Sequence, residues 1–233
     1  MSRIMVFSGA APYSDPWHPF GETSSAIART LSARGHEVVV REASPAALRE
    51  LGDVQLVVVN SGNGGPGAEP VDASVWRPAW EAFGAWHAGG GAILGVHTAA
   101  NTFRGWEEWP TILGGRWEVG VSGHPERSVA VFEPVPGAEG HPIVAGLAQV
   151  QAYDERYSDL EIAPGSRILL QHETADRFQP VVWAREAFEG CGRVVYDALG
   201  HDGRSYESSS RRQLLEREVD WLLRGSTPVR THR

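Results

Sequence analysis

The fold is decided by the stretch Gly91-Ala92-Ile93-Leu94-Gly95-Val96-His97-Thr98-Ala99-Ala100-Asn101, in which an apolar run ends abruptly at a polar residue. Such a run predicts a buried strand, and His97 marks the point where a helix begins. A side chain displayed on a tight strand-to-helix turn needs small residues two positions before and after it, here Gly95 and Ala99. The pattern Gly-x-His-x-Ala therefore predicts a nucleophile-elbow geometry with histidine in place of the nucleophile.

Apolar runs alternate with helical patterns on the N-terminal side of this stretch. Runs at residues 3–7, 38–40 and 53–59 alternate with expected helices at 22–33 and 71–87. Near-continuous apolar strands separated by helices are typical of a parallel sheet covered on both faces. We expect one α/β domain over residues 1–225 with a mostly parallel sheet, and a flexible tail at 226–233.

The C-terminal half adds further expected elements. Residues 106–113 and 205–224 have helical patterns, and strands are expected at 128–132, 167–171, 180–184 and 192–198. The loop between 167–171 and 180–184 is too short for a crossover helix, so these two strands form an antiparallel pair. Any exposed tryptophans on the helix at 71–87 would fit the face of a homodimer.

Composition narrows the classes of partner. The 233-residue chain carries a formal net charge of -8 and has no long basic run. This charge disfavours nucleic acid and anionic membranes as partners and leaves a small molecule as the expected one. No apolar stretch is long enough for a secretory signal or a membrane span, so we expect a cytoplasmic protein. A single cysteine, Cys191, excludes an internal disulfide.

The loop Asn60-Ser61-Gly62-Asn63-Gly64-Gly65-Pro66-Gly67 contains a formal Gly-x-Gly-x-x-Gly match at positions 62, 64 and 67. A dinucleotide-binding motif requires a helix that starts directly on the glycines. Here two prolines delay the helix until about Val71. The pattern therefore indicates a flexible or anion-accommodating loop rather than a nicotinamide cofactor site.

Polar residues follow several of the expected strands. Ligands of an open parallel sheet bind outside the carboxyl ends of the strands, so residues in these positions share one rim. His18, Thr98 and Gly200-His201 belong to this rim with the glycine loop. Asp154-Glu155 and His124 interrupt otherwise apolar patterns and are further candidates for the ligand-binding rim.

Short motifs throughout the chain resemble, in register, the ThuA-like (trehalose utilisation) family. They are Gly95-Val96-His97-Thr98-Ala99, Leu113-Gly114-Gly115, His124-Pro125, His141-Pro142-Ile143, Asp154-Glu155-Arg156-Tyr157, Pro180-Val181-Val182-Trp183 and Gly192-Arg193-Val194 to Leu199-Gly200-His201. The resemblance implies a class I glutamine amidotransferase-like fold, a flavodoxin-like three-layer sandwich, and a role in metabolism of trehalose or related disaccharides. Glutamine hydrolysis on this fold needs an elbow cysteine, so His97 argues against glutaminase activity.

Three uses of the rim stay open. In a hydrolase or lyase acting on a sugar derivative, His97 or His201 is the candidate general base, and Glu155 or Asp154 the candidate general acid. In a metal-dependent hydrolase, a zinc-type cation activates water, and its possible ligands are His18, His97, His124 and His201 with Glu155.

The third use is sugar binding without chemistry, in a pocket that has lost the elbow nucleophile. Trp17, Trp106 and Trp109 would then be platforms for stacking on a sugar ring. Each histidine could instead be a buried polar residue bonded to backbone carbonyls. For every use, the expected substrate contacts are His18, Asn60, Gly62, Thr98, Trp106, His124 and Tyr157.

Overall fold

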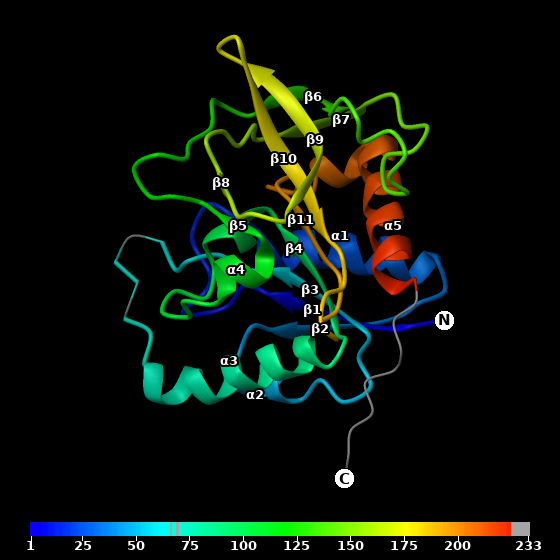
Figure 1. The fold of residues 1–233 in the computed structure, drawn as a ribbon. Helices are drawn as coiled ribbons and strands as arrows, with labels where there is room; N and C mark the ends of the chain where they lie inside the picture. The colour runs from blue at the N-terminus through cyan, green and yellow to red at the C-terminus, as the bar shows by residue number, and fades with distance from the viewer. Residues whose placement is uncertain (66, 69, 225–233) are drawn as a thin grey trace.

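The computed structural model describes residues 1–65, 67–68 and 70–224. Within this part of the chain, a nine-stranded sheet has the order β2-β1-β3-β4-β11-β10-β9-β6-β7 (Figure 1). The expected tail at 226–233 lies outside the described residues.

One half of the sheet is parallel. It consists of β1 (Arg3–Ser8), β2 (Glu37–Glu42), β3 (Leu56–Asn60), β4 (Ala92–Val96) and β11 (Val194–Asp197). Every residue of β3 and β4 is buried, as expected for parallel strands covered on both faces. The flavodoxin-like α/β fold expected from the sequence is confirmed.

The other half of the sheet is antiparallel. It consists of β10 (Arg177–Arg185), β9 (Arg167–Thr174), β6 (Ser128–Pro134) and β7 (Val150–Asp154). The expected antiparallel pair at 167–171 and 180–184 is confirmed by β9 and β10. Strand β7 has no counterpart among the sequence-based expectations, and it carries the site's carboxylates at its end.

Helices cover both faces of the parallel half (Figure 1). Helices α1 (Phe20–Ala33) and α5 (Ser209–Leu223) contact each other on one face. The opposite face carries α2 (Pro45–Arg49), α3 (Ala73–Ala88) and α4 (Trp109–Leu113), and a two-stranded sheet of β5 (Gly115–Arg116) and β8 (Glu161–Ile162) follows α4. Two short 3₁₀ helices, η1 (His97–Asn101) and η2 (Ser205–Glu207), follow β4 and precede α5.

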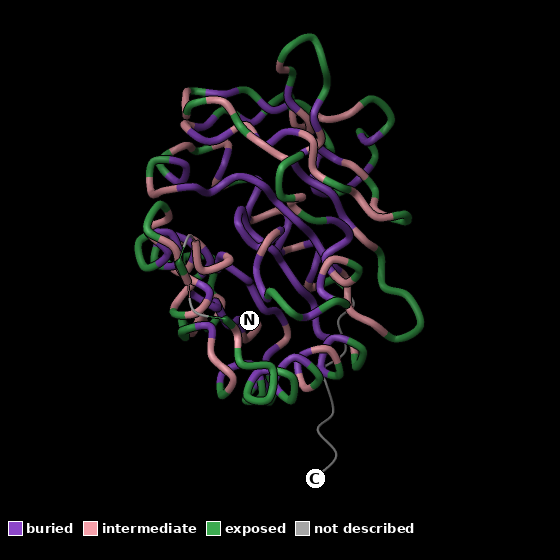
Figure 2. Tube along the Cα trace, turned by 90° about the vertical axis from the view of Figure 1, so that its left-hand side faces the viewer, coloured by how far each residue is buried: buried purple, intermediate pink, exposed green. Residues whose placement is uncertain are grey.

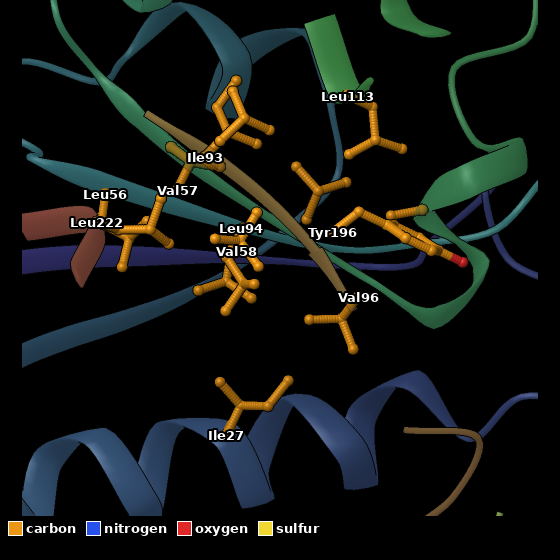
Figure 3. Packing of buried hydrophobic residues seen from close by; sticks show 14 of the residues in the cluster. Ile27, Leu56, Val57, Val58, Ile93, Leu94, Val96, Leu113, Tyr196 and Leu222 are labelled. Carbon is orange, nitrogen blue, oxygen red and sulfur yellow. The ribbon is translucent and has the colours of Figure 1, made fainter. Parts of the chain in front are cut away.

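The core lies between these layers, where the central strands β3, β4 and β11 are buried along their length (Figure 2). Ile27 of α1 points toward Val58 and Val96 on one side of the sheet, while Leu113 and Tyr196 lie on the other side (Figure 3). The tryptophans of α3 belong to this core, because Trp76, Trp80 and Trp86 are all at most 7% exposed. They therefore give no support to a homodimer face on this helix, and a homodimer stays a prediction without that argument.

The helices of the described residues are all too short or too polar to cross a bilayer.

A buried ionic group joins α5 to the end of β11. Arg211 Nη2 lies 2.8 Å from Asp197 Oδ2, and both side chains are fully buried. Glu218, about two helical turns further along α5, is also fully buried and faces Asp197 and Arg211. Burial, together with the negative charge of Asp197, raises the pKa of Glu218 well above 4.5. The folded protein therefore holds the proton of Glu218 to a higher pH than the unfolded chain does.

The substitution Glu218→Gln should make the protein more stable than the wild type at alkaline pH. The unfolded chain ionises Glu218 above about pH 4.5, whereas the folded chain keeps the proton, so wild-type stability falls as pH rises toward the folded pKa. The difference in free energy of unfolding should grow by up to about 1.4 kcal/mol per pH unit. Urea denaturation of both proteins between pH 5 and 9 measures it. Glu216→Gln, a half-exposed position on the same helix, is the control and should show no growing difference.

Candidate functional site

His97 lies at a strained turn between β4 and η1. Its φ is 50°, in the left-handed region that side chains other than glycine rarely adopt. A Cβ on Gly95 would lie 2.5 Å from Leu113 Cδ1 and 3.3 Å from Ala99 Cβ, so the turn requires glycine there. The elbow geometry expected from Gly-x-His-x-Ala is present, although the helix that follows is a short 3₁₀ helix.

The ends of several strands meet around His97. His18 lies in the loop after β1, and His201 follows β11. Strand β7 points the same way as β11, because an even number of antiparallel pairings separates them in the sheet. Its carboxyl end therefore brings Asp154 and Glu155 to the same rim.

Four side chains converge at this rim, and we name them the His/Glu cluster: His18, His97, Glu155 and His201. One ligand-capable atom from each lies within 4.8 Å of the other three. Glu155 and the last two histidines are at most 6% exposed. Buried imidazole and carboxylate groups at this spacing can hold a divalent cation.

His18 is oriented by Asp15. The Asp15 Oδ1 atom accepts a hydrogen bond from His18 Nδ1 at 2.6 Å. Burial and the neighbouring rings of His97 and His201 outweigh this contact and lower the pKa of His18 below 6.5, so the ring is neutral. Its Nε2 atom is buried and has no hydrogen-bond partner among the described residues. That atom presents a free lone pair to the cluster.

His97 is oriented by the backbone of Ala198. Its Nδ1 donates to the Ala198 carbonyl oxygen at 2.6 Å, which directs Nε2 into the site. Nε2 lies 3.1 Å from the Tyr157 hydroxyl and 3.3 Å from Glu155 Oε2. Burial opposes a charge on this ring, but the carboxylates of Glu155 and Asp154 raise the pKa of His97 above 6.5.

Glu155 lies between the histidines. Its Oε1 is 2.9 Å from His201 Nδ1, a close contact whose direction does not suit an N–H···O hydrogen bond. Burial raises the pKa of Glu155, but contacts with His201 and His97 outweigh it and hold that pKa well below 4.5. Glu155 is therefore a carboxylate at neutral pH, a state suited to a ligand or a base.

Asp154 faces the backbone rather than the cluster. Its Oδ2 accepts the N–H of Gly200 at 2.8 Å, and its Oδ1 accepts the N–H groups of His201 and Glu155 at 3.1 and 2.9 Å. These bonds attach the end of β7 to the turn that carries His201. The geometry gives Asp154 a positioning role, and Glu155 is the carboxylate of the pair that lines the cavity.

His18, Glu155 and His201 of the cluster line a cavity of about 670 Å³, and His97 lies behind them. Two tryptophans, Trp17 and Trp117, contribute indole rings to its wall, and Trp17 is 56% exposed. Among the expected substrate contacts, the cavity wall includes His18, Thr98, His124 and Tyr157. His124 stands outside the cluster, with Nε2 3.6 Å from Glu155 Oε2 and a side chain 36% exposed.

Other expected contacts lie elsewhere. The Asn60 amide is buried and donates to Thr23 Oγ1 and Ser24 Oγ of α1 at 2.8 Å. Trp106 and Trp109 belong to an aromatic group with Phe83 beneath α3, where Trp109 is 1% exposed. Trp109 opens α4 and Trp106 lies in the turn before it, and both indole rings are buried in the core, so neither is available to stack on a sugar in the cavity.

The glycine loop packs against the segment that carries His18. A Cβ on Gly62 would lie 2.6 Å from Asp15 Oδ2, and one on Gly64 would lie 2.5 Å from the Pro12 carbonyl oxygen. Gly64 and Gly65 also have φ values of 91° and 66°, which favour glycine. In the described part of this loop, the glycines allow Asp15 to approach closely and so support His18.

Sequence reasoning missed several residues of the site. Asp15 precedes His18 by three positions, and a carboxylate that close to a candidate ligand is a usable signal. Asn63, Trp117 and Arg127 also line the cavity, but they come from irregular segments in which the sequence gives no periodic pattern. Asn101, at the end of η1, lines it as well.

Comparison with known proteins gives the family. The model of the ThuA family, described as trehalose utilisation, matches residues 3–222. The chain belongs to this family. A search of curated protein sequences found no match.

Solved structures agree with this assignment. A ThuA-like protein from Parabacteroides merdae has a TM-score of 0.75 at 18% identity, over 100% of this chain and 92% of that one. Another, from Bacteroides uniformis, has a TM-score of 0.72 at 16% identity, over 97% and 93%. A glutamine amidotransferase from Thermotoga maritima has a TM-score of 0.50 at 9% identity, over 85% and 75%. At these identities the likeness concerns the fold, and the expected amidotransferase-like fold is confirmed.

The substitution Asp154→Asn should lower the free energy of unfolding by about 1–3 kcal/mol. An amide has one acceptor oxygen, so its NH₂ group would face at least one of the backbone N–H groups that now donate to Asp154. Urea denaturation measures the loss. Asp176→Asn, in the exposed turn between β9 and β10, is the control, because asparagine tolerates its φ of 57°. A loss no larger than that of the control would contradict the positioning role.

Proposed function

We propose that this ThuA-family protein is a metal-dependent hydrolase or lyase of sugar metabolism, with a zinc-type divalent cation held by the His/Glu cluster. Its substrate would be trehalose, a related disaccharide or an oxidised glycoside. The observation that carries the proposal is the convergence of the four ligand-capable atoms of the His/Glu cluster within 4.8 Å. Three of its residues, His18, Glu155 and His201, line a cavity. A tetrahedral zinc site has ligand atoms about 3.4 Å apart with bonds of about 2.1 Å, so small side-chain movements would close this cluster around a cation.

The partners of the histidines support a metal site. Metal-ligating histidines commonly donate their second ring nitrogen to a carboxylate or a backbone carbonyl, which fixes the tautomer and the ring orientation. Asp15 does this for His18, and the Ala198 carbonyl does it for His97. A cation would also satisfy His18 Nε2, which has no partner among the described residues.

The cavity supports a sugar as the substrate. Trp17 and Trp117 offer flat apolar faces to a sugar ring, while Asn63, Asn101 and Thr98 offer polar groups for hydroxyls. A bound cation could activate a water molecule as the nucleophile or polarise a carbonyl of an oxidised sugar. We do not expect glutamine hydrolysis, since His97 occupies the elbow position. A cytoplasmic location stays a prediction.

Metal binding tests the first half of the proposal. Protein purified without a His tag, stripped with a chelator and offered zinc should bind about one equivalent per chain, measured by elemental analysis. His97→Ala should weaken zinc binding more than about 100-fold, because removing a ligand costs more than removing an outer partner. His36→Ala, in the turn before β2, is the control and should bind zinc like the wild type. Less than about a tenth of an equivalent in the wild type would overturn the metal site.

Turnover tests the second half. A panel of disaccharides and their oxidised derivatives should yield product only with metal-loaded protein, and a chelator should abolish the rate until zinc is restored. Turnover that survives complete metal removal would favour acid–base catalysis by the same histidines and Glu155. Sugar affinity by calorimetry with no product over hours would favour the binding-only function.

A further inference from the structure

The Tyr157 hydroxyl has a single partner in the site. It lies 3.1 Å from His97 Nε2, and no other hydrogen bond of this hydroxyl is formed among the described residues. The side chain is 3% exposed, so bulk water does not replace a lost partner. The ring is held in place by stacking on His97, with centroids 4.5 Å apart, and by the edge of Trp117 at 4.7 Å.

A cation bound by His97 would take this partner away. The Nε2 atom of an imidazole has one lone pair, which cannot serve both a metal and a hydrogen bond from Tyr157. Metal binding therefore leaves a buried O–H group without an acceptor, directly beside the metal. A buried donor without an acceptor is costly, so the group requires a new acceptor nearby.

We propose that Tyr157 donates a hydrogen bond to the oxygen atom of water or substrate that binds the metal beside His97. This inference rests on the proposed metal site and assigns the residue that would stabilise negative charge on the metal-bound oxygen. Tyr157 lines the cavity and its hydroxyl lies beside His97, and the ring contacts allow little movement other than rotation of the O–H bond. Tyr157 would thereby take the role that backbone donors have in an oxyanion hole.

The test uses the full chain loaded with Co²⁺, whose visible spectrum reports on added anions. Acetate binds through oxygen and accepts a hydrogen bond, whereas thiocyanate is a poor acceptor. Tyr157→Phe should keep one cobalt per chain, weaken acetate about 10-fold and leave thiocyanate affinity within about twofold. Tyr153→Phe, on β7 and stacked under Arg204, is the matched control and should change neither anion.

Equal acetate affinity in Tyr157→Phe and the wild type would overturn the role of Tyr157. The same conclusion would follow if Tyr157→Phe bound acetate and thiocyanate more weakly by the same factor, or if it lost its cobalt. Absence of stoichiometric cobalt in the wild type would instead overturn the metal site itself, so the two failures are distinguishable. If Tyr157→Phe does not fold, the wild-type sequence can be made with 3-fluorotyrosine in place of tyrosine. Because its hydroxyl is a stronger hydrogen-bond donor, this protein should bind acetate more tightly than the unlabelled wild type. Unchanged acetate affinity in that protein would also overturn the inference.

Discussion

The left-handed backbone at His97 is the constraint on which the site depends. A non-glycine residue at a φ of 50° is unfavourable by itself, so the surrounding packing must enforce it. Gly95 permits Leu113 to close over the turn, and Tyr196 donates to the His97 carbonyl oxygen at 2.8 Å. Together these contacts aim the ring of His97 at the place where the other strand ends meet.

A layer of supporting contacts surrounds the His/Glu cluster. Asp15 orients His18, the Ala198 carbonyl orients His97, and Asp154 holds the turn that carries His201. Beneath them, Asp197 and Arg211 attach the end of β11 to α5 and to the Leu199 carbonyl oxygen. The chemistry-bearing atoms therefore sit on a rigid support, which is what precise ligand geometry requires.

Sequence patterns predicted the parallel half of the fold and most of the cluster, because buried strands are continuous apolar runs and their ends share a rim. His18, His97 and His201 could be found in this way. The different roles of Asp154 and Glu155 could not be predicted. Which of these two adjacent carboxylates faces the cavity depends on how the end of β7 meets the turn after β11. Trp106 was misplaced because the sequence around an aromatic residue does not show whether its ring meets the core or a ligand.

The cluster draws His18 from the loop after β1 and His201 from the turn after β11. A nascent chain emerging from the ribosome therefore holds no more than three of the four ligands until β11 and its turn have been synthesised. Chains that end before His201 cannot form the cluster, however well their early strands pack. Formation of the site thus requires the whole sheet, from the loop after β1 to the turn after β11.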